Sequence, residues 1–143
     1  MSQIFEVAGN VLWHPSNGPA RLFLRQVPVF EAEVKGPSGV GPMVNDECQI
    51  DPAAFRNFVD ALLRWYRATH HPVMTAMAEG FICTALVLAE RAGLELRWYA
   101  PDQTYDHLKP SDAQTERALA AALNGRMGDL RERAREHGRS MVM

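Results

Sequence analysis

The segment from Val73 to Ala92 is the most apolar part of the chain and constrains the fold most strongly. Its only charged side chain before the last turn is Glu79. The nearly uncharged stretch His70 to Ala89 reaches the lower length limit of a membrane span, but an ionisable group at the centre of a bilayer is costly. We therefore predict a central, buried core helix that stops at Gly93.

Composition places this helix in a single globular domain. Apolar residues make up 47% of the 143 residues and charged residues 22%, a balance typical of globular proteins. We expect one domain over 1–143, with a core over 1–100 and a C-terminal helical extension over 111–138. The net charge of −2 disfavours nucleic acid as a partner. The first residues lack the basic start of a signal peptide, so we expect a cytoplasmic protein without a membrane partner.

The first half of the chain combines turn signals with short apolar runs. Gly9-Asn10 predicts a tight turn between strands over 2–8 and 11–14. A helix is expected from about Gly18, kinked or broken at Pro28. The Gly- and Pro-rich segment 36–45 predicts a long loop, followed by a short strand near 47–50. Asp51 and Pro52 have the character of a helix cap and first helical position.

The second half begins with the core helix and continues with a strand signal. Residues 94–100 alternate apolar and polar side chains, which predicts a half-buried strand. After a linker over 101–110, Ser111 and Gln114 form a capping box for a last helix, which Gly125 and Gly128 can interrupt. Its end, 131–139, alternates in charge sign and is expected to be solvated. The fold class predicted is α+β: a small, mainly antiparallel sheet from the N-terminal hairpin and strands near 47–50 and over 94–100, packed by three or four helices.

Candidate chemistry is sparse. The Gly-rich loop lacks the Gly-Lys-Ser/Thr ending of a phosphate-binding loop. None of the five histidines forms an i, i+4 pair, and Cys-x-x-Cys is absent, so neither a metal nor a cofactor is predicted. Cys48 and Cys83 are expected to be reduced thiols with a packing role. No catalytic motif is recognisable, so enzyme activity stays an open question.

The acidic residues offer two alternatives each. Asp46 and Glu47 lie where the loop meets a strand; they could hold a metal ion or form an acid and base pair, or Asp46 could simply stabilise a turn beside an exposed Glu47. Glu79 must find a partner or take up a proton if it is buried. Its pairing with an arginine, such as Arg21, Arg25 or Arg97, competes with a role inside a pocket.

Several strings resemble a family of small, uncharacterised actinobacterial proteins. They are Leu-Trp-His-Pro-Ser-Asn-Gly at 12–18, Gly-Pro-Met-Val-Asn-Asp-Glu-Cys-Gln-Ile-Asp at 41–51, and Glu-Gly-Phe at 79–81. The resemblance covers about residues 1 to 98, and no activity is established for that family. It implies that the two longer segments are the distinctive parts of the chain.

Two functions compete on this basis. The first is a small binding protein, such as an accessory, adaptor or immunity-type protein, that uses its sheet surface and the loop 36–46 to bind an unknown partner. The second is a small-molecule-binding domain or small enzyme with one pocket. The candidate ligand-binding residues for that pocket are Trp13, Asn17, Asp46, Glu47 and Glu79. A homodimer is a further expectation, because closed symmetric dimers are the commonest assemblies.

Overall fold

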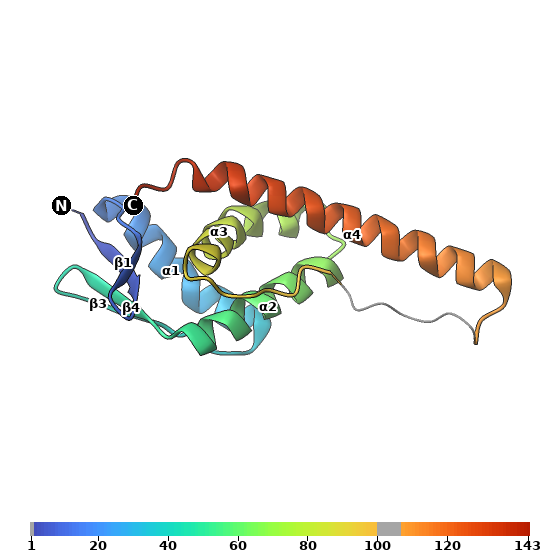
Figure 1. The fold of residues 1–143 in the computed structure, drawn as a ribbon, viewed down its shortest axis with the longest axis horizontal. Helices are drawn as coiled ribbons and strands as arrows, with labels where there is room; N and C mark the ends of the chain where they lie inside the picture. Colours follow the sequence, from blue (N-terminus) through green and yellow to red (C-terminus); the bar gives the residue numbers. More distant parts are fainter. Residues whose placement is uncertain (1, 100–106) are drawn as a thin grey trace.

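A four-stranded sheet lies at one end of the molecule in the computed structural model, which describes residues 2–99 and 107–143 (Figure 1). The strands are β1 (Ile4–Val7), β2 (Asn10–Trp13), β3 (Val40–Val44) and β4 (Glu47–Ile50), in the order β2-β1-β4-β3. Two antiparallel hairpins, β1–β2 and β3–β4, meet along a parallel β1–β4 pair. With four helices packed beside and beyond this sheet, the predicted α+β class and mainly antiparallel sheet are confirmed.

The first hairpin turns one residue earlier than predicted. Ala8 and Gly9 have positive φ angles of 48° and 82°, and Asn10 already belongs to β2. The turn therefore uses the freedom of Gly9 at its second position.

The predicted loop over 36–45 contains a strand, which corrects the sequence-based assignment. β3 pairs with β4 because Asn45 and Asp46, with φ of 51° and 63°, make a tight turn that returns the chain. Gly41 permits this pairing, since a Cβ atom there would lie 2.8 Å from the carbonyl oxygen of Gln49. The glycine thus marks a close approach of two strands, although it suggested a loop.

The strand predicted over 94–100 does not form among the described residues, and residue 100 and the linker over 101–106 lie outside them. The segment instead attaches to side chains of α2 (Pro52–Ala68). The backbone N–H of Arg97 donates to Asp60 at 2.9 Å, and Arg67 donates to the carbonyl of Arg97 at 3.2 Å. Side chains therefore satisfy backbone groups that a sheet would otherwise pair.

The first two helices follow the sequence signals. α1 (Asn17–Val34) continues through Pro28, so the helix does not break there. α2 begins as predicted, with the Asp51 side chain accepting from the N–H of Ala53 at 3.2 Å and Pro52 in the first turn.

The predicted core helix is confirmed as α3 (Pro72–Arg91). Every residue from Phe81 to Ala89 is buried, and the Phe81 ring stacks between Phe23 and Phe30 at centroid distances of 5.2 and 4.3 Å. By length and composition α3 could cross a membrane, and half of its apolar window is buried inside the protein. The core helix of a globular fold meets the same criterion.

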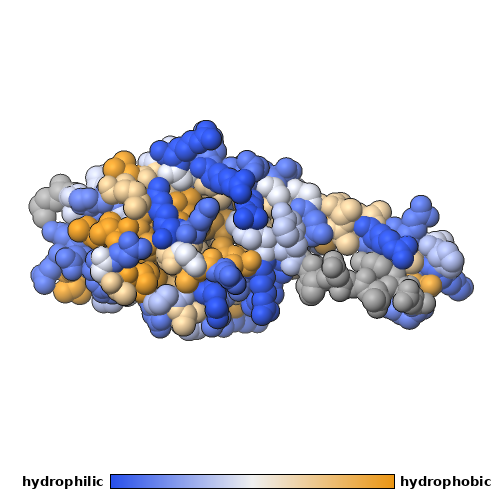
Figure 2. Space-filling model, viewed as in Figure 1, coloured by the Kyte–Doolittle hydropathy of each residue, from blue (hydrophilic) through white to orange (hydrophobic). Residues whose placement is uncertain are grey.

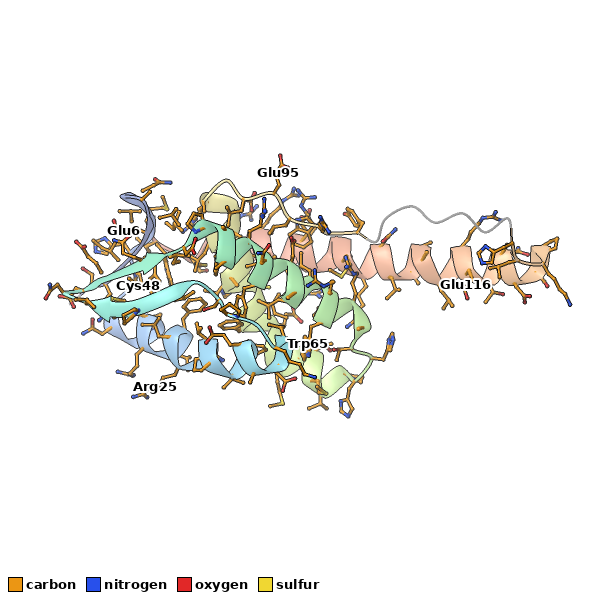
Figure 3. All side chains as sticks on the ribbon, turned by 90° about the horizontal axis from the view of Figure 1, so that it is seen from below. Glu6, Arg25, Cys48, Trp65, Glu95 and Glu116 are labelled. Atoms are coloured by element: carbon orange, nitrogen blue, oxygen red, sulfur yellow. The ribbon has the colours of Figure 1, made fainter. Side chains whose placement is uncertain are left out.

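The last helix, α4 (Pro110–Gly138), differs from expectation in two ways. Its N-cap is Lys109, without a side-chain capping bond, and it is continuous through Gly125 and Gly128. Its first half projects beyond the body of the molecule, as Figure 1 shows and as the position of Glu116 in Figure 3 illustrates. Most of the charged side chains over 131–139 are exposed, as predicted, while Met127, Leu130 and Ala134 are buried against the core.

Candidate functional site

An apolar groove of about 660 Å³ lies between α1, α3 and the last residues of the chain. We call it the α1–α3 groove. Its floor is aromatic and is formed by Trp13 at the end of β2, Phe23 of α1 and Phe81 of α3. Figure 2 shows, on one face, that hydrophobic residues gather at this compact end of the molecule, where the sheet and α1 lie.

The floor of the groove is preformed by ring contacts. Trp13 stacks on Phe5 at a centroid distance of 5.2 Å and meets Phe23 edge-on at 6.1 Å. Because these rings are also buried in the core, their orientation is determined by the folding of the sheet onto α1. A ligand would therefore meet a surface that needs little reorganisation.

The rim of the groove consists of large apolar side chains that face water. Leu22 of α1 is 61% exposed, Met77 of α3 is 75% exposed and Val142 near the C-terminus is 68% exposed. Such residues are unremarkable singly, but a contiguous group around a concave surface is typical of a binding site.

The C-terminal tail, residues 139–143, forms one wall of the groove and is held by hydrogen bonds from Arg91 and from the backbone of His14. Arg91, at the end of α3, donates to the carbonyls of Leu12, Gly138 and Met141 at 2.9, 3.0 and 2.8 Å. The N–H of His14 also donates to the carbonyl of Val142 at 2.9 Å. The tail thus covers the end of the edge strand β2.

A polar pair lies at the α4 side of the groove. The Thr84 hydroxyl donates its one proton to the carbonyl of Gly80 at 2.9 Å, and His137 Nε2 lies 2.9 Å from the same hydroxyl oxygen. His137 Nε2 must therefore be the donor in this contact. The pair can orient a ligand, but Thr84 is not activated as a nucleophile, because its proton points to a carbonyl rather than to a base.

A second hollow adjoins the groove and shares Gly80, His137 and Ser140 with it. It contains Glu79, which forms an ion pair with Arg133 of α4. Burial lowers the pKa of Arg133, but the Glu79 carboxylate and Tyr66 outweigh this and raise it above its usual value. Of the alternatives left open for Glu79, the structure shows an ion pair with an arginine at the edge of a hollow.

The partner of Glu79 is not one of the three arginines suggested by the sequence. Arg21, Arg25 and Arg97 do not pair with Glu79, because α4 returns along α3 and brings Arg133 to it. The ion pair lies at the surface, where the two side chains are 45% and 32% exposed.

The five predicted site residues do not surround one pocket. Trp13 lines the α1–α3 groove, whereas Glu79 lies in the adjoining hollow. Asn17 is exposed as the first residue of α1. Asp46 and Glu47 are exposed at the β3–β4 turn, so the predicted pocket around Trp13 does not contain them.

The strand register explains the position of these two carboxylates. Successive side chains of a strand alternate between faces, and Cys48 and Ile50 occupy the buried face of β4. Glu47 must therefore point outward, and the left-handed φ of Asp46 places it in the turn itself. The structure therefore agrees with the alternative in which Asp46 belongs to a turn and Glu47 is exposed.

The two cysteines are free and buried, as predicted. Burial raises the pKa of the Cys48 thiol to about 11, and burial together with the Glu79 carboxylate raises that of Cys83 to about 11. Both are thus neutral near pH 7, which is unfavourable for nucleophilic catalysis. Within residues 2–99 and 107–143, no three His, Cys, Asp or Glu side chains are grouped as a metal site would require.

From the sequence, Met77 could line an adaptable apolar pocket or fill the core, but the assembled rim and the polar pair were not predicted. Leu22 belongs to a helix, Met77 to the core helix and His137 to a predicted solvated end, so no local pattern joined them. The one usable signal was the apolar terminus Met141-Val142-Met143, which is unusual after such a charged segment.

The structure thus defines a small α+β protein with a preformed apolar groove and with thiols unsuited to covalent catalysis. Comparison with known proteins then places it: the chain belongs to a family of unknown function (DUF6086), whose model matches residues 1–143. This confirms the resemblance to an uncharacterised family and extends it beyond residue 98. No curated protein and no solved structure matches the chain.

Proposed function

We propose that this protein is a binding protein that receives apolar side chains of a protein partner in the α1–α3 groove. The observation that carries the proposal is the exposed apolar rim. Leu22, Met77 and Val142 come from three separate parts of the chain and surround one concave surface. Burying such side chains is the main favourable contribution to protein association.

The extent of the apolar surface favours a protein partner over a small molecule. Apolar exposure continues on the same two helices, with Val29 of α1 57% exposed and Val73 and Met74 of α3 58% and 42% exposed. A ligand confined to the groove would leave these side chains in water. Methionine side chains also adapt easily to the shape of a partner.

A small apolar molecule is the second candidate. The volume of about 660 Å³ falls within the range of small-molecule sites, roughly 300–1,000 Å³. The aromatic floor and the Thr84–His137 pair would supply apolar contact and one polar anchor. This candidate requires that the rim contribute little to binding.

Competition for the groove separates the two candidates. The uncharged fluorescent dye Nile red should bind the full chain and brighten, because its emission increases in an apolar site. A synthetic amphipathic helix of leucine and lysine should displace the dye if the groove accepts a protein segment. Displacement by hexanol but not by that peptide would overturn the proposal and support the small molecule.

Paired variants place the binding at the groove. Met77→Lys should weaken dye and peptide binding about ten-fold, which corresponds to about 1.4 kcal/mol. Leu119→Lys is the matched control, since Leu119 is 56% exposed on α4 and does not line the groove. Equal affinity in both variants, at unchanged melting temperature, would locate the binding elsewhere and contradict the proposal.

A further inference from the structure

A second site candidate is a polar hollow of about 410 Å³ between α2 and the segment 94–99. Arg56 and Arg64 of α2 and Arg97 of the segment line it, together with Asp60 and Glu95. We propose that this arginine hollow binds a small molecule through a phosphomonoester group. The proposal concerns a site separate from the α1–α3 groove, because the two share no lining residue.

The charges of the hollow are not internally balanced. In the part of the chain that the structure describes, none of the three guanidinium groups forms an ion pair or donates a hydrogen bond. Three cations face two carboxylates, so the hollow carries an excess positive charge. An added anion would relieve the repulsion among the arginines.

The backbone holds the third arginine above the other two. Arg56 and Arg64 lie one turn before and one turn after Asp60, so all three occupy one face of α2. The Arg97 N–H donates to Asp60 at 2.9 Å, and its carbonyl accepts from Arg67 at 3.2 Å. These two hydrogen bonds fix the backbone of Arg97 opposite the α2 face, one through its N–H and one through its carbonyl.

Glu95 leaves room for a ligand. Figure 3 shows its side chain projecting outward from the segment, away from the helices. One oxygen of Asp60 is already occupied by the Arg97 N–H. The carboxylates thus border the hollow, and Asp60 serves there chiefly as a positioning residue.

The chemistry of three arginines selects the ligand class. Guanidinium groups bind phosphate through two parallel hydrogen bonds and stay charged at every physiological pH. A phosphomonoester carries nearly two negative charges at pH 7 and three strong acceptor oxygens. The volume exceeds that of one phosphate, and Leu96 adds an apolar lining, so an organic part of the ligand can also be accommodated.

Calorimetric titration of the full chain with phenyl phosphate at constant ionic strength tests the proposal. We expect saturable binding that is tighter than binding of inorganic phosphate, and no binding of acetate. Binding of inorganic phosphate as tight as that of phenyl phosphate would overturn the claim for an organic ligand. Absence of saturable heat with phenyl phosphate would overturn the site altogether.

Substitutions distinguish the site from general charge attraction. Arg64→Gln and Arg97→Gln should each weaken phenyl phosphate binding about ten-fold, as expected for loss of a charge-assisted contact. Arg25→Gln is the matched control, since Arg25 is exposed on α1, opposite Glu95 in Figure 3. Equal weakening by Arg25→Gln would overturn the proposal.

Asp60→Asn should have the opposite effect to the arginine substitutions, which a purely structural role of Asp60 would not produce. The amide oxygen of asparagine can still accept from the Arg97 N–H, while the negative charge beside the ligand disappears. Phenyl phosphate should therefore bind several-fold more tightly. Weaker binding in a variant that melts like the wild type would contradict the assigned role of Asp60.

Discussion

Replacing Arg91 with alanine tests how the C-terminal tail is held. One guanidinium group joins three carbonyls from β2, the end of α4 and the tail. Removal leaves the carbonyls of Leu12, Gly138 and Met141 without this donor. Because Arg91 is only half-buried, water can replace part of the loss.

The expected loss of stability follows from the number of hydrogen bonds that Arg91 donates. A hydrogen bond to a charged group contributes about 1.5–3 kcal/mol, and we discount the three by roughly half for access of water. The expected loss in the free energy of unfolding is about 2–4 kcal/mol for Arg91→Ala. With a urea dependence of about 2 kcal/mol per molar, the midpoint should fall by about 1–2 M. Arg91→Lys should lose about half as much, since one ammonium cannot span three carbonyls.

Equilibrium urea unfolding measures the loss, and digestion with a carboxypeptidase measures release of the tail. The control is Arg139→Ala, because Arg139 pairs with Glu136 at the surface, where the side chains are 77% and 72% exposed. That control should change stability by less than about 0.5 kcal/mol. A similarly small loss in Arg91→Ala, with no faster removal of Met143, would refute the role of Arg91.

Three further predictions follow from burial and backbone geometry. Phe81→Ala should destabilise the fold by about 3–5 kcal/mol in urea unfolding, because the ring is 2% exposed and stacks on two others; a loss below about 1 kcal/mol would contradict the packing. Gly39→Ala should lower the melting temperature, since φ is +75° and a Cβ would lie 2.9 Å from the carbonyl oxygen of Asp51; an unchanged value would refute the strain. Folding raises the pKa of the Cys48 and Cys83 thiols from 9.0 to about 11, so their contribution to the free energy of unfolding is complete below pH 9 and is lost as pH rises toward 11. A double Cys→Ala variant should therefore show a smaller fall in the free energy of unfolding between pH 9 and 11. An equal fall in the variant would exclude the thiols as its source.

The helices and the first hairpin, whose signals lie in neighbouring residues, were predictable from the sequence. The apolar run of α3 indicated a core helix, Asp51-Pro52 indicated a helix start, and Gly9 indicated a hairpin. Each of these signals acts within one or two turns of the chain, where capping, backbone freedom and side-chain periodicity decide the conformation.

The errors arose where distant residues compete for the same backbone groups. β3 formed inside a predicted loop because β4 was available to pair with it, and residues 94–99 attached to α2 because Asp60 and Arg67 satisfied their backbone. The end of α4 is largely solvated, as predicted, but its partners depend on tertiary structure: Glu79 of α3 pairs with Arg133, and Thr84 of α3 contacts His137.

The candidate site residues also fall into those that the sequence indicated and those that only the tertiary structure brought together. The sequence alone identified Trp13, because it is an aromatic residue beside a distinctive turn motif. It also indicated that Glu79 requires a partner, because it is an acidic residue in an apolar helix. Tertiary structure alone brought Leu22, Met77 and Val142 to one rim and set Arg97 above α2. The physical reason is that a binding surface is made by elements far apart in the chain, whose relative positions follow from packing of the core and not from the residues that line the surface.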